Sequence, residues 1–178
     1  MAEAQDRVSP PSDGRLASAG LQNLTTWILT DGKIGDEQNC FGVARALGVK
    51  PDVRRIAPRL PFSWLMPFGP IDPREAPGRP DGPLAGSLPD LLLASGRRSV
   101  PYVRAIKKAS GGRTFTVILK DPRTGPSVAD LIWVPEYDRL RGPNVIVTLT
   151  SPHPVSHEAL AAARANPDPR LASLPKPR

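Results

Sequence analysis

A chain of 178 residues is long enough for one domain, but 23 prolines and 15 glycines mean that much of it must be loop. The formal charge of +7 lies entirely in the second half, because residues 1–89 hold 10 basic and 10 acidic side chains whereas residues 90–178 hold 14 and 7. This excess is compatible with phosphate, nucleic acid or an anionic membrane. Nucleic acid is disfavoured, since no aromatic residues alternate with the basic ones to stack on bases.

The single cysteine, Cys40, excludes an internal disulfide and a cysteine-based metal cluster, and its apolar helical surroundings predict a buried side chain. No apolar run approaches the roughly 18 residues of a membrane span. Residues 1–23 contain acidic residues and no apolar core, so neither a secretory signal nor a transit peptide is predicted. We interpret this segment as a disordered tail and expect a cytoplasmic protein. No metal-ligand spacing, catalytic triad or cofactor fingerprint is found in the sequence.

The folded domain is predicted over residues 24–165 and begins with a strand over residues 24–30. After a loop with two glycines, a helix is expected to begin near Asp36, whose carboxylate would cap the first turn, and to end at Gly48. A second strand over residues 51–56 follows. Strand, helix and strand in so few residues are typical of a parallel crossover unit.

Residues 57–89 are rich in proline and predict a long irregular loop, a flap of unknown role in which Phe62 to Met66 form an apolar turn against the core. Beyond it, apolar runs predict four more strands, over residues 90–95, 114–119, 131–134 and 145–149. A helix from Val100 to Ala109 would be capped by Ser99.

Together these elements predict an α/β, Rossmann-like, doubly wound parallel sheet. A last helix is expected over residues 156–165. Residues 166–178 are typical of a linker, and because linkers connect domains, we expect a second domain that this chain lacks.

Three polar loops follow the carboxyl ends of predicted strands and are therefore expected at one edge of the sheet. Glycine allows close backbone approach to a ligand, a helix amino terminus offers free amides, and arginine binds phosphate through two hydrogen bonds. The loops therefore predict an anion-binding pocket. Its candidate residues are Asp31, Gly32, Lys33, Gly35 and Asp36 in the first loop, Gly96, Arg97, Arg98 and Ser99 in the second, Lys120, Asp121 and Arg123 in the third, and His153 after the last strand.

Each loop also has a purely structural interpretation. The segment 31–35 matches neither the Walker A pattern nor the dinucleotide fingerprint, and a simple turn explains it equally well. Arg97 and Arg98 precede a helix amino terminus, where cations are unfavourable unless an anion joins them, which favours a function. Residues 120–123 are equally explained by a turn with an internal Asp to Arg ion pair, and a loop histidine such as His153 more often has no special role.

Several segments, in this order, resemble the mitochondrial fission factor family, which is known from plants and has many bacterial members. The resemblance extends over residues 24–178, and the high content of Arg, Ala and Pro suits a GC-rich bacterial source. The segments are WILTDGKIGDEQ (27–38), ASGRRSVPY (94–102), FTVILKDPR (115–123), PEYD (135–138) and GPNVIVTL (142–149).

The family's architecture is similar to the two-domain GT-B glycosyltransferase fold, in which the carboxyl-terminal domain binds the donor nucleotide. Bacterial members are often labelled nucleoside-diphosphate-sugar epimerases. The resemblance therefore implies the amino-terminal, acceptor-side half of a protein that binds or acts on a sugar-phosphate or nucleotide-sugar, with a glycosyltransferase-like or nucleotide-sugar-modifying activity that requires the second domain.

One position departs from the family pattern. Relatives tend to carry a histidine followed by a basic residue after the sixth strand, whereas this chain has His153-Pro154, which weakens the case for an anion site at that corner. The alternative hypothesis is a non-catalytic module that docks on an anionic membrane surface or on a partner protein.

Overall fold

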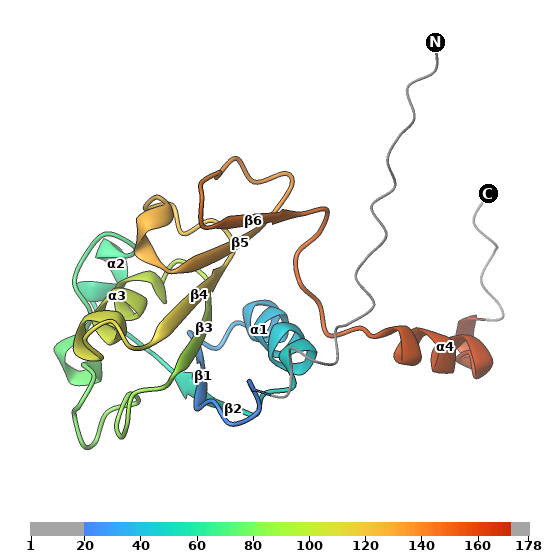
Figure 1. Ribbon diagram of the computed structural model, residues 1–178, viewed down its shortest axis with the longest axis horizontal. Helices are drawn as coiled ribbons and strands as arrows, with labels where there is room; N and C mark the ends of the chain where they lie inside the picture. Colours follow the sequence, from blue (N-terminus) through green and yellow to red (C-terminus); the bar gives the residue numbers. More distant parts are fainter. Residues whose placement is uncertain (1–19, 172–178) are drawn as a thin grey trace, which may run out of the picture.

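The computed structural model describes residues 20–171 and shows one sheet with helices on both of its faces (Figure 1). The strands are parallel and lie in the order β2-β1-β3-β4-β5-β6. Each lies within two residues of its predicted bounds, and the predicted Rossmann-like α/β fold is confirmed. The strands are β1 (Thr26–Thr30), β2 (Pro51–Arg55), β3 (Leu91–Ser95), β4 (Phe115–Leu119), β5 (Leu131–Pro135) and β6 (Val145–Thr148).

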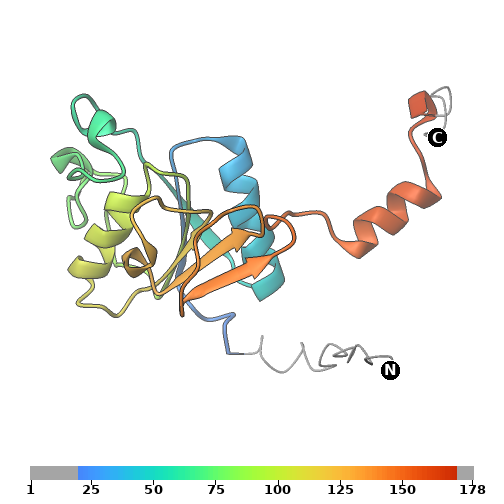
Figure 2. The same ribbon diagram turned by 90° about the horizontal axis from the view of Figure 1, so that it is seen from above.

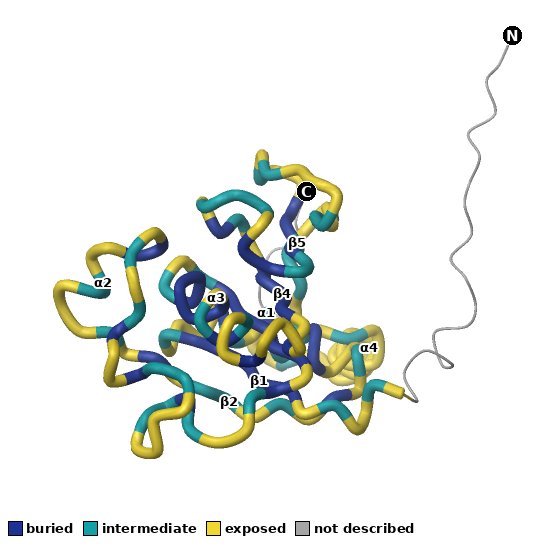
Figure 3. The backbone as a smooth tube through the Cα atoms, turned by 60° about the vertical axis from the view of Figure 1, so that its left-hand side comes forward, coloured by how far each residue is buried: buried dark blue, intermediate teal, exposed yellow. Residues whose placement is uncertain are grey.

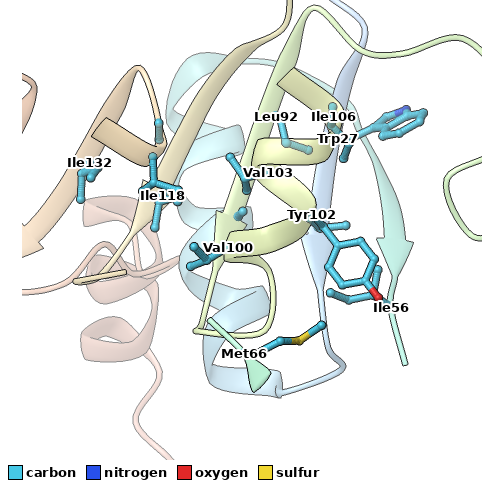
Figure 4. Close-up of a cluster of buried hydrophobic side chains, with 14 of the residues drawn as sticks. Trp27, Ile56, Met66, Leu92, Val100, Tyr102, Val103, Ile106, Ile118 and Ile132 are labelled. Atoms are coloured by element: carbon cyan, nitrogen blue, oxygen red, sulfur yellow. The ribbon is translucent and has the colours of Figure 1, made fainter. Parts of the chain in front are cut away.

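The sheet lies between two helices, α1 (Ile34–Leu47) on one face and α3 (Val100–Ala109) on the other (Figure 2). All residues of β1 and β3 are buried, which explains why these strands are uninterrupted apolar runs rather than alternating ones. Alternate side chains of each strand enter two separate clusters. The α1 side contains Ile28, Cys40, Leu93, Val117 and Leu119, and the α3 side contains Leu92, Tyr102, Ile106, Ile118 and Ile132 (Figure 4).

Local sequence correctly predicts the carboxyl-terminal end of α1 but not its start. Gly48 adopts a left-handed conformation with φ of 70°, and its N–H donates to the carbonyls of Ala44 and Arg45, so the predicted terminator is confirmed. The helix begins at Ile34, with Lys33 at the N-cap position, and not near Asp36 as predicted. This shift places Asp36 inside the first turn and changes its role.

Cys40 lies in the middle of α1 and is 1% exposed, as predicted. Burial, with a smaller contribution from the nearby carboxylates of Asp36 and Glu37, raises the pKa of its thiol to about 12. Because the thiolate is the reactive form, we expect native Cys40 to react with a disulfide reagent at pH 8 about 100-fold more slowly than the urea-unfolded chain. Timed labelling in the two states measures this ratio. Equal rates would show that the thiol is accessible in the folded protein.

The proline-rich segment 57–89 is built onto the α3 face and contains a one-turn helix, α2 (Phe62–Leu65), and a 3-10 turn, η1 (Pro73–Glu75). The buried carboxylates of Asp72 and Glu75 anchor it. Arg59 donates to both Asp72 oxygens at 2.8 Å, the Ala57 N–H donates to Glu75 Oε1 at 2.6 Å, and Tyr102 donates its hydroxyl to Glu75.

The apolar turn predicted within this segment divides between core and solvent. Met66 is buried and Phe62 packs against the core, whereas Trp64 and Leu65 are exposed. Figure 3 shows exposed stretches of chain around α2. A single helical turn points its side chains in several directions, so Trp64 and Leu65 face the solvent while Phe62 and Met66 face the core.

The last helix, α4 (His157–Ala165), extends away from the sheet, and all its residues are exposed (Figure 1). Ser156 caps it by accepting the Ala159 N–H at 3.2 Å. A 3-10 turn, η3 (Pro169–Leu171), lies within the predicted linker, while residues 1–19 of the predicted tail and residues 172–178 lie outside the described part. Between residues 20 and 171, no helix combines the length and apolar character that a membrane crossing needs.

Candidate functional site

A pocket of about 330 Å³ opens at the carboxyl edge of the sheet, where β3 and β4 end. The segments that meet there are the first turn of α1, the loop after β3 and the loop after β4, so the structure brings together residues from all three predicted loops. The pocket is lined by Asp36, Gly96, Arg97, Lys120, Asp121 and Arg123.

Asp36 is the buried centre of this edge, with a side chain only 8% exposed. Its carboxylate accepts hydrogen bonds from Ser95 Oγ at 2.8 Å and from Lys120 Nζ at 2.5 Å. The prediction that Asp36 caps α1 is therefore wrong, because the helix begins two residues earlier and its third residue faces the sheet edge. The carboxylate instead ties α1 to the ends of β3 and β4.

The loop after β3 is shaped by a close approach to Asp36. Gly96 has a φ of +84°, and a Cβ atom there would lie 2.9 Å from Asp36 Oδ2. Ser99 closes the turn by donating its hydroxyl to the Gly96 carbonyl at 2.7 Å. The predicted capping of α3 by Ser99 is wrong, since Ser99 already has helical backbone angles and its side chain makes no capping bond.

The two adjacent arginines have different environments. Arg98 lies 3.6 Å from the Asp31 carboxylate, which is also 3.6 Å from Lys33, so Arg98 belongs to the first loop's ion pairs. The Asp31 side chain is 5% exposed, and its Oδ1 has no hydrogen-bond partner among the described residues. Arg97 is exposed and lines the pocket.

The loop after β4 holds two cationic residues in left-handed conformations, Lys120 with φ of 99° and Arg123 with φ of 61°. Asp121 accepts the backbone N–H of Arg123 at 2.7 Å, so the turn is closed without the predicted pairing of the two side chains. Non-glycine residues with such angles are strained, and strain of this kind clusters at functional sites. Within residues 20–171, the guanidinium groups of Arg97 and Arg123 form no ion pair.

The remaining candidates lie outside the pocket. Gly32 has φ of +86° and donates its N–H to Thr30 Oγ1 at 3.0 Å, while Gly35 is the second residue of α1, where a Cβ atom would meet nothing within 4 Å. The backbone of His153 crosses the middle of α1, where a Cβ on Gly42 would lie 2.8 Å from it. His153 borders a different pocket, of about 620 Å³, beside Trp133 and Thr148.

Ser95 is a residue of the candidate site that sequence reasoning missed. It is 2% exposed and donates to Asp36, which orients the carboxylate. The available signal was a polar residue at the end of a fully apolar strand. No cluster of three or more His, Cys, Asp or Glu side chains that could hold a metal occurs in the part of the chain that the structure describes.

A protein-family model described as Mitochondrial fission ELM1 matches residues 34–178. The match begins at the first residue of α1 and includes both loops that contribute cations to the pocket. No curated protein and no solved structure gives a significant match. The family model covers most of the sequence and agrees with the resemblance carried by the ordered motifs. The chain therefore belongs to the mitochondrial fission ELM1 family.

Proposed function

We propose that the chain is the amino-terminal, acceptor-side domain of a GT-B-like protein and that the pocket at the carboxyl edge binds the phosphate of a sugar-phosphate or nucleotide-sugar. The observation that supports this proposal is that one pocket is lined by two guanidinium groups, Arg97 and Arg123, that form no ion pair within the described residues. Ligands of open α/β sheets bind at this edge, outside the carboxyl ends of the strands.

The charge balance of the pocket favours an anionic group. Three cationic side chains, Arg97, Lys120 and Arg123, face two carboxylates, Asp36 and Asp121, and Asp36 is already paired with Lys120. Arg97 also lies three residues before α3, whose amino terminus carries a partial positive charge and free N–H groups. A phosphate would relieve this repulsion and accept paired hydrogen bonds from each guanidinium.

The pocket's size and one-sidedness favour a small ligand bound between two domains. A volume of about 330 Å³ is at the lower end of the range for small-molecule sites. A sugar-phosphate bound through its phosphate to the arginines would have its hydroxyls beside Asp36 and Asp121, which line the same pocket. In the proposed architecture, the second domain supplies the opposite wall and binds the nucleotide.

Calorimetric titration of the 178-residue chain with glucose 1-phosphate, UDP-glucose and inorganic phosphate tests the pocket. We expect Arg97→Ala and Arg123→Ala each to weaken binding by about tenfold or more, because each removes charge-assisted hydrogen bonds. Arg97→Lys should recover only part of the affinity, since lysine keeps the charge but not the two-bond geometry.

Arg139→Ala is the matched control, because Arg139 is an exposed arginine that does not line the pocket. It should bind as the unsubstituted chain does. The proposal fails if Arg97→Ala and Arg139→Ala have equal affinities while both retain the circular dichroism of the folded chain. It also fails if none of the three probes binds the unsubstituted chain.

A further inference from the structure

Four large apolar side chains project from the apolar loop, residues 60–70, which contains α2. Leu60 is 70% exposed, Trp64 85%, Leu65 51% and Phe68 71%. The yellow stretches around α2 in Figure 3 show this exposure at the periphery of the fold. Such a concentration on one short segment marks an interaction site rather than chance surface composition.

The apolar loop is held firmly from beneath. Met66 is 3% exposed in the α3-side core, and Arg104 of α3 donates from Nη2 to the Pro67 carbonyl at 2.8 Å. The adjoining residues carry the Asp72 and Glu75 anchors described above. The exposed side chains therefore sit on a fixed support and do not depend on the loop folding back over them.

The charge around the apolar loop is positive. Residues 60–70 contain no ionisable side chain. Beside Phe68, a pocket of about 420 Å³ is lined by Arg104 and Lys108 and by no carboxylate. The nearest following acidic residues, Asp72 and Glu75, are buried and bonded inward, so they offer little negative charge to a surface that meets the loop.

We infer that the apolar loop inserts into the interface of an anionic lipid bilayer, with Arg104 and Lys108 binding lipid phosphates. Tryptophan, phenylalanine and leucine partition into the headgroup boundary, and each nearby cation adds attraction to anionic lipid. A protein partner is less suited, because stable interfaces use roughly 20–30 residues a side and this loop has far fewer. Arg104 and Lys108 form a cationic rim that is complementary to lipid phosphate, which favours a bilayer over a protein partner.

This inference does not depend on the proposed sugar-phosphate pocket, since no residue of the apolar loop lines that pocket. The two surfaces can therefore be separated by substitution. Arg97→Ala should leave vesicle binding unchanged, and Trp64→Ser should leave phosphate binding unchanged.

Co-sedimentation of the full chain with vesicles of phosphatidylcholine, with and without about 30% phosphatidylglycerol, tests the inference. The phosphatidylglycerol gives the vesicle surface the negative charge that attracts basic side chains. We expect binding only with phosphatidylglycerol, and release when the salt is raised to about 0.5 M. Trp64→Ser should lower the partition coefficient about tenfold and Lys108→Ala about fivefold.

Tryptophan emission gives an independent readout of insertion. Of the three tryptophans, Trp27 is buried, Trp133 is half-buried against the α1-side cluster and Trp64 is exposed in the apolar loop, so a blue shift on adding anionic vesicles should be abolished by Trp64→Ser. Leu149→Ser and Lys50→Ala are matched controls, because both residues are exposed and neither belongs to the apolar loop or its cationic rim. Both controls should bind vesicles as the unsubstituted chain does.

Three results would overturn the inference. One is equal binding to both vesicle types, which would remove the role of the cations. Another is an equal loss of binding in Trp64→Ser and Leu149→Ser. The third is self-association by light scattering that Trp64→Ser abolishes, without any vesicle binding, which would assign the apolar loop to contact between copies. Because Trp64 is 85% exposed, its replacement does not threaten the fold.

Discussion

Replacement of Tyr102 by alanine is expected to lower the free energy of unfolding by about 4–5 kcal/mol, a large part of the stability of a typical domain. Tyr102 is fully buried on α3, beside Ile56 and Met66 in the core (Figure 4). Its hydroxyl donates to Glu75 and accepts the Asp72 N–H at 3.3 Å. The substitution therefore creates a cavity and also leaves buried polar groups without partners, which costs more than the lost contacts alone.

Urea denaturation followed by circular dichroism measures this effect. Tyr102→Phe keeps the ring and removes only the hydroxyl, so it should cost about 1–2 kcal/mol. Tyr137→Ala is the matched control, because Tyr137 is 76% exposed, and it should change stability by less than about 0.5 kcal/mol. A similar loss in the two alanine variants would show that segment 57–89 is not anchored through Tyr102.

Acidification is expected to destabilise the protein below about pH 4, with Asp72 as a main cause. The paired hydrogen bonds from Arg59 hold the pKa of Asp72 well below its usual range, despite the opposing effect of desolvation. A carboxyl whose pKa is lower in the folded state stabilises the fold above its unfolded pKa. That contribution is lost as the pH falls through the unfolded value towards the folded one.

Urea denaturation of the unsubstituted chain and of Asp72→Asn is measured at about pH 7, 4 and 3. Stability should be constant near the first value, begin to fall near the second and fall steeply near the third. The variant should be less stable at neutral pH and should lose less stability on acidification. Hydrogen bonds to Asp90 and Asp130 also lower their pKa values, so some acid sensitivity should remain. Asp81→Asn, at an exposed position of the same segment, should retain the full pH dependence. An unchanged pH profile in Asp72→Asn would contradict the assignment.

The amino-acid sequence by itself determined the strands, the two helices that cover the sheet and the family. Buried strands are continuous apolar runs, and Gly48 ends α1 through a local left-handed conformation, so both can be predicted from neighbouring residues alone. The expectation that three loops meet at one edge follows from parallel strand direction, which short connections through helices enforce. These features depend on local periodicity and on the rules of chain connection.

The arrangement of the pocket was decided only by tertiary structure. Arg97 and Arg98 are indistinguishable in sequence, yet Arg98 lies beside Asp31 and Arg97 lines the pocket, because their side chains leave a turn in different directions. His153 follows β6 at the sheet edge, and its backbone crosses α1 at Gly42 instead of joining the other loops. No local pattern encodes either outcome.

The same limit explains Asp36 and segment 57–89. Asp36 pairs with Lys120, which is 84 residues away, and Glu75 pairs with Tyr102, 27 residues away. Such contacts form only once the strands have assembled in their final order, because only then do these side chains come within hydrogen-bond distance. Sequence patterns therefore located the edge of the candidate site, while long-range packing decided which side chains form ion pairs there and which cations line the pocket without one.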